Sequence, residues 1–176
     1  PAILTGGEIS HSINSLFLIN DFNLSASLQG NVSARVEQTS LNDHWQILPR
    51  ASLTYKMKDF YLSAIAGLYQ QLPENSFLLR NQHLSAERCW QYILGAYHEA
   101  NGKTFRLEVY NKKYHNLATN LNNNYKSDGY GYARGIDLFL NDREVVKNLE
   151  YMLAYSYNDS KRKYGDYPAE AMPQYA

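Results

Sequence analysis

Apolar and polar residues alternate along several long stretches of this chain. The clearest stretch covers residues 24–36, where alanine, leucine, glycine and valine alternate with serine, glutamine, asparagine and arginine. Because neighbouring side chains of a β-strand point to opposite faces, this pattern predicts a strand with one apolar and one polar face. Similar patterns predict further strands at residues 8–19, 47–57, 60–69, 90–99, 104–114, 130–140 and 149–158.

Short turn motifs separate some of these stretches. Asn101-Gly102 lies between two alternating runs, and this is the strongest local hairpin signal because both residues accept positive φ. Tight turns are also predicted at Lys58-Asp59 and at residues 20–22. Each strand of the 90–114 hairpin runs about eleven residues, longer than is usual. Tilted by about 40°, such a strand would span roughly 27 Å, close to the apolar band of an outer-membrane barrel.

The predicted connections alternate in length. Short ones cover residues 20–23, 58–59, 100–103 and 141–148, and long ones cover 37–46, 70–88, 115–129 and the final 159–176. Short turns at one end and long loops at the other are typical of transmembrane barrels. The sequence therefore predicts an all-β fold, an antiparallel up-and-down meander of about eight long strands that forms part of a transmembrane β-barrel.

Composition narrows the function. The 176 residues carry a formal net charge of zero, which gives no indication of nucleic-acid binding, and no run of apolar residues is long enough for a transmembrane helix. The 16 tyrosines fit either ordinary β-propensity or aromatic girdles at the membrane surface, to which Tyr55, Trp90, Tyr92, Tyr155 and Tyr157 are assigned. Cys89 is expected to be a packing residue. No catalytic, metal or cofactor motif occurs, so no enzyme is predicted.

Five segments, taken in order, resemble the β-barrel of TonB-dependent outer-membrane receptors, especially the kind found in Bacteroidetes. They are Leu48–Tyr55, Leu84–Gly95, Arg106–Leu117, Gly129–Asp137 and Tyr155–Arg162, with Ala86 where the family commonly has proline. The resemblance implies a barrel of about 22 strands in the bacterial outer membrane. It also implies an N-terminal plug domain and the import of a scarce nutrient with energy relayed by TonB.

The chain departs from this pattern, because it has too few strands, no plug and no closing strands before Ala176. We therefore expect residues 1–176 to be a single segment of a larger barrel. Its expected partners are outer-membrane lipid, the rest of the same receptor, TonB through the plug, and a small nutrient of unknown identity. Two alternatives stay open: a complete eight-stranded outer-membrane barrel with a structural or adhesive role, and a soluble β-rich binding module.

Charged residues on the polar faces are expected to line the lumen, either as ligand contacts or as a solvated wall of cross-strand ion pairs. The principal ones are Arg35, Arg50, Lys56, Arg106, Glu108, Lys112, Arg134 and Asp137, with Glu99 and Glu150 beside them. The long loop 70–88 is the best binding candidate, because its aromatic and amide groups suit stacking and hydrogen bonding. Its candidate ligand contacts are Tyr69, Phe77, Arg80, Asn81, Gln82 and His83. The alternative is a loop that folds over the rim for packing alone.

Overall fold

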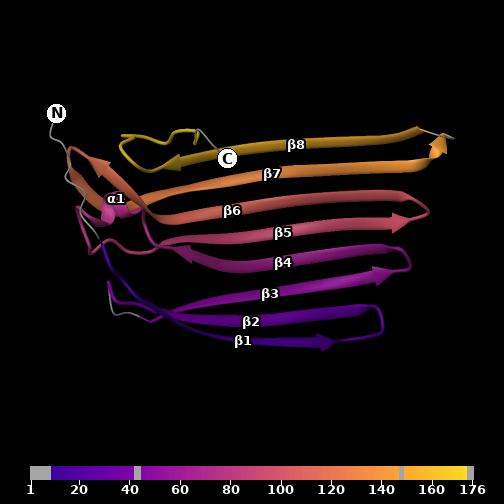
Figure 1. The fold of residues 1–176 in the computed structure, drawn as a ribbon, viewed down its shortest axis with the longest axis horizontal. Coiled ribbons are helices and arrows are strands. Elements are labelled where there is room, and N and C mark those ends of the chain that lie inside the picture. The colour runs from indigo at the N-terminus through magenta and orange to yellow at the C-terminus, as the bar shows by residue number, and fades with distance from the viewer. Residues whose placement is uncertain (1–8, 42–44, 147–148, 174–176) are drawn as a thin grey trace.

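The computed structural model describes residues 9–41, 45–146 and 149–173. Eight strands pair in chain order to form one antiparallel sheet, and a short helix lies between the fourth and fifth strands (Figure 1). The elements are β1 (Ile13–Asn23), β2 (Leu28–Thr39), β3 (Trp45–Met57), β4 (Phe60–Gln71), α1 (Asn75–Leu78), β5 (Glu87–Ala100), β6 (Lys103–Leu121), β7 (Asn124–Val146) and β8 (Leu149–Lys163). No helix among these residues is long and apolar enough to cross a membrane. The predicted all-β meander is confirmed.

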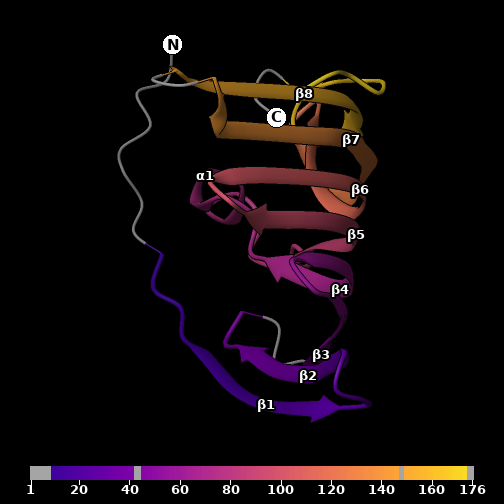
Figure 2. The same cartoon turned by 90° about the vertical axis from the view of Figure 1, so that its right-hand side faces the viewer.

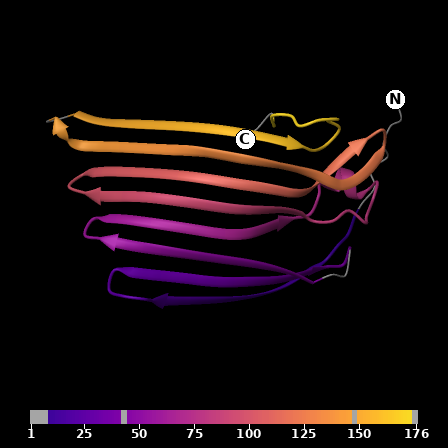
Figure 3. The ribbon, with the colours of Figure 1, turned by 180° about the vertical axis from the view of Figure 1, so that it is seen from behind.

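The sheet is open and bowed rather than closed. Figure 2 shows that it curves toward the side on which α1 lies, and Figures 1 and 3 show its two sides. Strands β1 and β8 form its two edges, and among the described residues they do not pair with each other. A complete eight-stranded barrel would require that pairing, so the structure does not support this alternative.

Residues with positive φ form the tight turns between β3 and β4 and between β5 and β6. Asn101 and Gly102 have φ of 50° and 67°, and Lys58 has φ of 50°, so the predicted turns at 101–102 and 58–59 are confirmed. The turn predicted at residues 20–22 is wrong, because Asp21 and Phe22 continue β1 and pair with β2. The chain reverses at residues 24–27, where Leu24 N donates to Leu28 O at 2.9 Å. The Asn-Asp pair had the composition of a turn, but the Ser-rich stretch after it provides the side-chain acceptors.

The long loops are shorter than predicted because several strands continue beyond the alternating stretches. The loop predicted at 115–129 is a continuation of the β6–β7 hairpin, closed by Asn122 and Asn123 with φ of 54° and 60°. Two register shifts and the positive φ of Asn116 interrupt its ladder. This hairpin lies beyond the apolar band, where its faces do not separate lipid from lumen, so it has no reason to alternate and its polar composition predicted a loop. Likewise, residues 159–163 belong to β8.

The two faces of the sheet differ in chemistry. The cross-strand register places Leu53, Ala64, Leu94, Val109, Ile136 and Tyr157 in one row on the convex face. Most of these side chains are exposed, and the buried apolar residues, such as Leu78 and Leu84, gather near the long connections. A water-soluble globule rarely leaves so large an apolar face uncovered. The convex face is therefore suited to lipid.

The upper limit of this apolar band slopes across the sheet. One row of paired residues joins Val32 of β2 to Asp159 of β8. On β2 the apolar residues of the convex face continue past Val32 for four residues toward the long connections, to Val36. On β8 they end at Tyr157, two residues from Asp159 on the side of the short turns. The limit thus shifts by roughly 20 Å along the strands over about 29 Å across them, a slope of about 35°. Transmembrane barrel strands are tilted by about 35–45°, so a level membrane would produce this slope.

Candidate functional site: a recess at the rim of the inner wall

The concave face carries the charged residues expected in the lumen. The register places seven of the eight principal residues on it, namely Arg35, Arg50, Lys56, Arg106, Glu108, Lys112 and Asp137. Arg134 is the exception, because it pairs in register with Asn111 and Asp159 and shares the convex face with Ile136. Its position follows from strand geometry, since residues two apart in a strand share a face. The prediction that Arg134 lines the lumen is therefore wrong.

Cations on the concave wall are held against tyrosine rings. The guanidinium carbon of Arg50 lies 4.2 Å from the ring centroid of Tyr69, and that of Arg162 lies 4.1 Å from the ring of Tyr114. Arg162 Nη2 also donates to the hydroxyl of Tyr114 at 3.0 Å. Such stacking contributes about 0.5–2 kcal/mol and holds the cation flat along the wall.

A recess opens beside these stacks, near the end of the sheet that carries the long connections. This rim recess has a volume of about 190 Å³ and is lined by Tyr69, Gln70, Gln71, Glu87, Arg88, Cys89, Gln91, Tyr114, Leu117 and Arg162. A neighbouring cavity of about 480 Å³ shares Gln71, Glu87, Leu117 and Arg162 and extends to Phe77 of α1. The rim recess therefore lies on the concave face, at the end of the sheet that carries the long connections.

Several polar atoms around the rim recess are buried and have no hydrogen-bond partner. They are Nε of Arg50, Arg88 and Arg162 and Oε1 of Gln70. Glu87, by contrast, is fully engaged, because it accepts hydrogen bonds from Ala118 N and from Gln71 Nε2, both at 2.9 Å. Buried polar atoms in native proteins nearly always have partners. Of these three arginines, Arg50 and Arg162 lie on the concave face and Arg88 shares the convex face with Trp90.

The loop between β4 and β5 is fixed against the β6–β7 hairpin. Phe77 meets Tyr125 edge to face with ring centroids 5.7 Å apart, and Asn81 Nδ2 donates to Tyr125 O at 3.0 Å. Ser85 N donates to Ser127 Oγ at 2.9 Å. Of the predicted loop contacts, Phe77 and Asn81 thus hold the loop in place and Tyr69 lines the rim recess, whereas the remaining three, Arg80, Gln82 and His83, are exposed at the rim.

The hairpin is also tied to the segment that follows β8. Gly165 N donates to Ala118 O at 2.8 Å, and Asn120 N donates to Gly165 O at 2.5 Å. Thr119 Oγ1 donates to Asp128 at 2.5 Å, and this hydrogen bond, with Lys163 Nζ 3.5 Å away, holds the pKa of Asp128 below its ordinary value. These contacts lie beyond the apolar band and fix the hairpin to the segment that follows β8.

The strands contribute site residues that the sequence analysis did not identify. Glu87, Gln91, Tyr114 and Arg162 line the rim recess but were not among the candidates. Arg162 lies four residues beyond Asn158, where the prediction ended the last strand, so its face could not be assigned. Continuing the alternation past Asn158 would have placed Arg162 on the same face as Glu150. Among the residues that the structure describes, no group of three His, Cys, Asp or Glu side chains could hold a metal ion.

Comparisons with known proteins agree with this geometry. The family model "TonB dependent receptor-like, beta-barrel" matches residues 4–176. No curated protein sequence matches the chain. Solved structures do match in fold. The siderophore receptor PirA from Pseudomonas aeruginosa aligns with a TM-score of 0.73 and 16% sequence identity, over 86% of this chain and 33% of that one.

Two further solved structures share the fold. The FrpB iron transporter from Neisseria meningitidis aligns with a TM-score of 0.70 and 12% identity, over 86% of this chain and 26% of that chain. The ferric-catecholate import receptor Fiu from E. coli has a TM-score of 0.70 and 8% identity, over 88% of this chain and 28% of that chain. The chain thus spans about a third or less of these receptors.

The match to the family model covers nearly the whole chain, and the fold agrees with it independently. The origin of the chain in Bacteroidetes stays a prediction. The family consists of transporters rather than enzymes, and its members reside in the bacterial outer membrane. The chain belongs to the β-barrel family of TonB-dependent receptors, of whose barrel it forms one portion.

Proposed function

We propose that this chain is one segment of a larger receptor barrel, and that its rim recess helps to bind an extracellular nutrient for uptake. The observation that carries this proposal is the rim recess itself. It combines the inward-facing guanidinium group of Arg162, which stacks on Tyr114, with further tyrosine and glutamine side chains at the end of the long connections. Such convergent polar groups are typical of a binding site in a preformed cavity.

The charges favour an anionic ligand. Arg162 lines the recess on the concave face together with Glu87, whose carboxylate already accepts two hydrogen bonds, and Arg50 stacks on Tyr69 beside it. Arginine recognises carboxylate and similar oxygen anions with strong, directional hydrogen bonds. The names of the similar structures include a siderophore receptor and a ferric-catecholate import receptor. A negatively charged iron chelate would suit the rim recess, so we propose this ligand class.

The proposal that the barrel is larger is supported by the edges of the sheet. On β1 both faces are apolar and exposed, with Leu16 and Leu18 on one face and Phe17 and Ile19 on the other. A long, apolar, unpaired edge would be an aggregation hazard if it stayed open. Further strands of the same receptor would cover β1 and β8, and a plug domain that engages TonB would fill the lumen beside the concave face. The complete gene sequence tests this point directly.

Uptake by cells tests the proposed site. The intact receptor, as its only copy in the cell, should import radioactive iron supplied as a negatively charged catecholate chelate. Arg162→Gln should weaken binding of that chelate by about 10- to 100-fold, because a charge-assisted hydrogen bond is lost. Arg143→Gln is the matched control, since Arg143 lies at the opposite end of the sheet and pairs with Glu150.

Chelates of different charge separate the outcomes. If the ligand is anionic, a neutral hydroxamate chelate should not depend on Arg162. Unchanged affinity of every tested chelate in Arg162→Gln, with the variant present in the membrane at normal levels, would exclude the rim recess as the binding site.

A further inference from the structure

A second cavity, larger than the rim recess, lies on the convex face of the sheet. This outer groove has a volume of about 720 Å³. Its floor consists of small side chains, Ala51, Ala64 and Ala66, and larger apolar side chains such as Leu94, Val109 and Ile136 border it. Alanines hollow the surface because they leave space between taller neighbours. The groove is thus an apolar trough on the face that is suited to lipid.

The outer groove leads from the edge of the apolar band into its interior. At β7 it reaches Arg134, which stands one row above the last apolar residue of that strand, Ile136. At β3 it reaches Ala51 and Leu53, and there the band continues upward to Ile47 and beyond. Four strand spacings separate the two ends, roughly 19 Å. A chain that enters at Arg134 and follows the groove therefore descends into the membrane.

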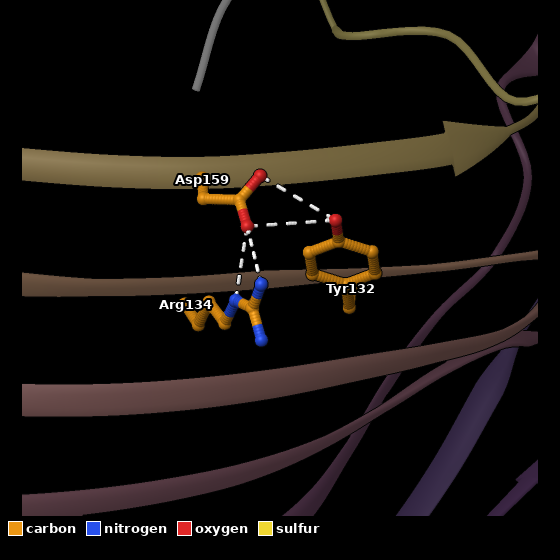
Figure 4. A network of polar contacts seen from close by, with 3 residues as sticks. All are labelled: Tyr132, Arg134 and Asp159. Atoms are coloured by element: carbon orange, nitrogen blue, oxygen red, sulfur yellow. Dashed lines mark hydrogen bonds and ion pairs between the residues drawn. The ribbon is translucent and has the colours of Figure 1, made fainter.

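Cations gather where the groove meets the edge of the band. Arg134 Nη2 and Nε lie 2.8 Å and 2.9 Å from a carboxylate oxygen of Asp159, and the hydroxyl of Tyr132 donates to the same carboxylate at 3.4 Å (Figure 4). This network holds the guanidinium at the mouth of the groove. One row above, the register aligns Lys113, Tyr132 and Lys161.

Both lysines in this row are exposed, and no other described residue forms an ion pair with either of them. They lie on two strands separated by β7, so their Cα atoms are roughly 10 Å apart. In the two rows that hold these cations, Asp159 is the one acidic residue among the described residues of β6, β7 and β8, and Arg134 already binds it. The convex face therefore presents surplus positive charge directly above an apolar trough.

We propose that the outer groove and Lys113, Arg134 and Lys161 bind a phosphorylated lipid of the outer leaflet. One acyl chain lies along the groove, and the head-group phosphates lie over the cations. The site faces away from the lumen, so the imported ligand does not reach it, and it does not depend on the proposed function of the rim recess. Cations next to a membrane surface attract anionic head groups, and charge-assisted hydrogen bonds to phosphate are strong.

The test uses the intact receptor in detergent micelles and lipid A, a bisphosphorylated glycolipid, as the probe. The doubly substituted variant Lys113→Gln/Lys161→Gln should raise the apparent Kd for lipid A by about tenfold or more, because two favourable charges are removed. Lys56→Gln/Arg106→Gln is the matched control, since it removes two cations from the concave face, and it should leave the Kd unchanged. Heat-modifiable migration on gels confirms that each variant is folded.

Two further measurements separate the head group from the chain. The Kd of the unaltered receptor for lipid A without phosphates should be raised. It should be close to the Kd of the Lys113→Gln/Lys161→Gln variant for intact lipid A. Ala64→Phe, which fills the floor of the groove, should weaken binding of both lipids. The proposal is overturned if the phosphates make no difference to binding, or if Ala64→Phe and the lysine variant both bind lipid A as tightly as the unaltered receptor.

Discussion

An arginine placed at two neighbouring positions of β3 should have very different effects on stability. Leu53 is 44% exposed on the convex face and pairs with Gly30 and Ala64. Thr54, the next residue, lies on the concave face between Gln29 and Ser63. Leu53→Arg would place a charge against lipid, whereas Thr54→Arg would place the same charge on the wall of the lumen.

The position of Leu53 in the strand sets the magnitude. It lies four residues from Met57 at the turn, roughly 13 Å along the strand, or about 10 Å along the membrane normal at a tilt of about 40°. An apolar band about 25 Å tall then places Leu53 near the midplane. Arginine at the midplane of a barrel costs about 2–4 kcal/mol, equivalent to roughly 30- to 900-fold in the folding equilibrium. Thr54→Arg should cost less than about 1 kcal/mol.

Denaturant titration of the intact receptor in phospholipid vesicles provides the assay, with heat-modifiable gel migration as an independent measure of folding. The midpoint should fall strongly for Leu53→Arg and little for Thr54→Arg. Equal losses for both variants, or a larger loss for Thr54→Arg, would refute the assignment of the convex face to lipid.

Three further predictions concern local structure. Asn123→Val should increase proteolytic cleavage of the hairpin tip whereas Asn123→Gly should not, because the residue has φ of 60° and only the β-branched side chain is strained there. The stability that ionised Asp128 contributes should be complete above the pKa of this residue in the unfolded state, and it should be lost as pH falls through its lowered pKa in the folded state. Thr119→Val should move this loss to higher pH, because the hydrogen bond that lowers the pKa of Asp128 is removed. Thermal unfolding measured across a range of pH tests this. Gly135→Ala should lower the melting temperature, because its Cβ would lie 2.2 Å from Tyr157 O.

Strands whose two faces meet different environments were predictable from the sequence. The alternation around Leu94 follows from lipid on one side and the lumen on the other, and Asn101-Gly102 fixes its hairpin through backbone preference alone. Beyond the apolar band, as in the hairpin around Asn122, the two faces no longer separate lipid from lumen, so alternation disappears and composition predicts a loop. The same loss of contrast concealed the last residues of β8, and with them Arg162.

The candidate site was only partly predictable. The sequence identified the 70–88 loop as a rim element, but the contacts of Phe77 and Asn81 with Tyr125 depend on a hairpin that was predicted as a loop. The tight turn at 58–59 fixes the register that pairs Arg50 with Gly67, but the sequence alone does not specify that the Arg50 side chain reaches diagonally to the ring of Tyr69. Arg134 was assigned to the lumen because it is charged. Its spacing of two residues from Ile136 already placed it on the opposite, apolar face, so alternation was the better guide than charge.

The central claim is that the convex face meets lipid and the concave face meets the lumen of a receptor barrel. The most direct measurement is a scan of single spin-labelled cysteines at residues 91–98 of β5, in the intact receptor with Cys89 replaced by alanine. Accessibility to oxygen, which concentrates in lipid, should peak at Tyr92, Leu94 and Ala96, and accessibility to a water-soluble relaxation agent should peak at the residues between them. Accessibility without a period of two, or with the two sets exchanged, would contradict the account.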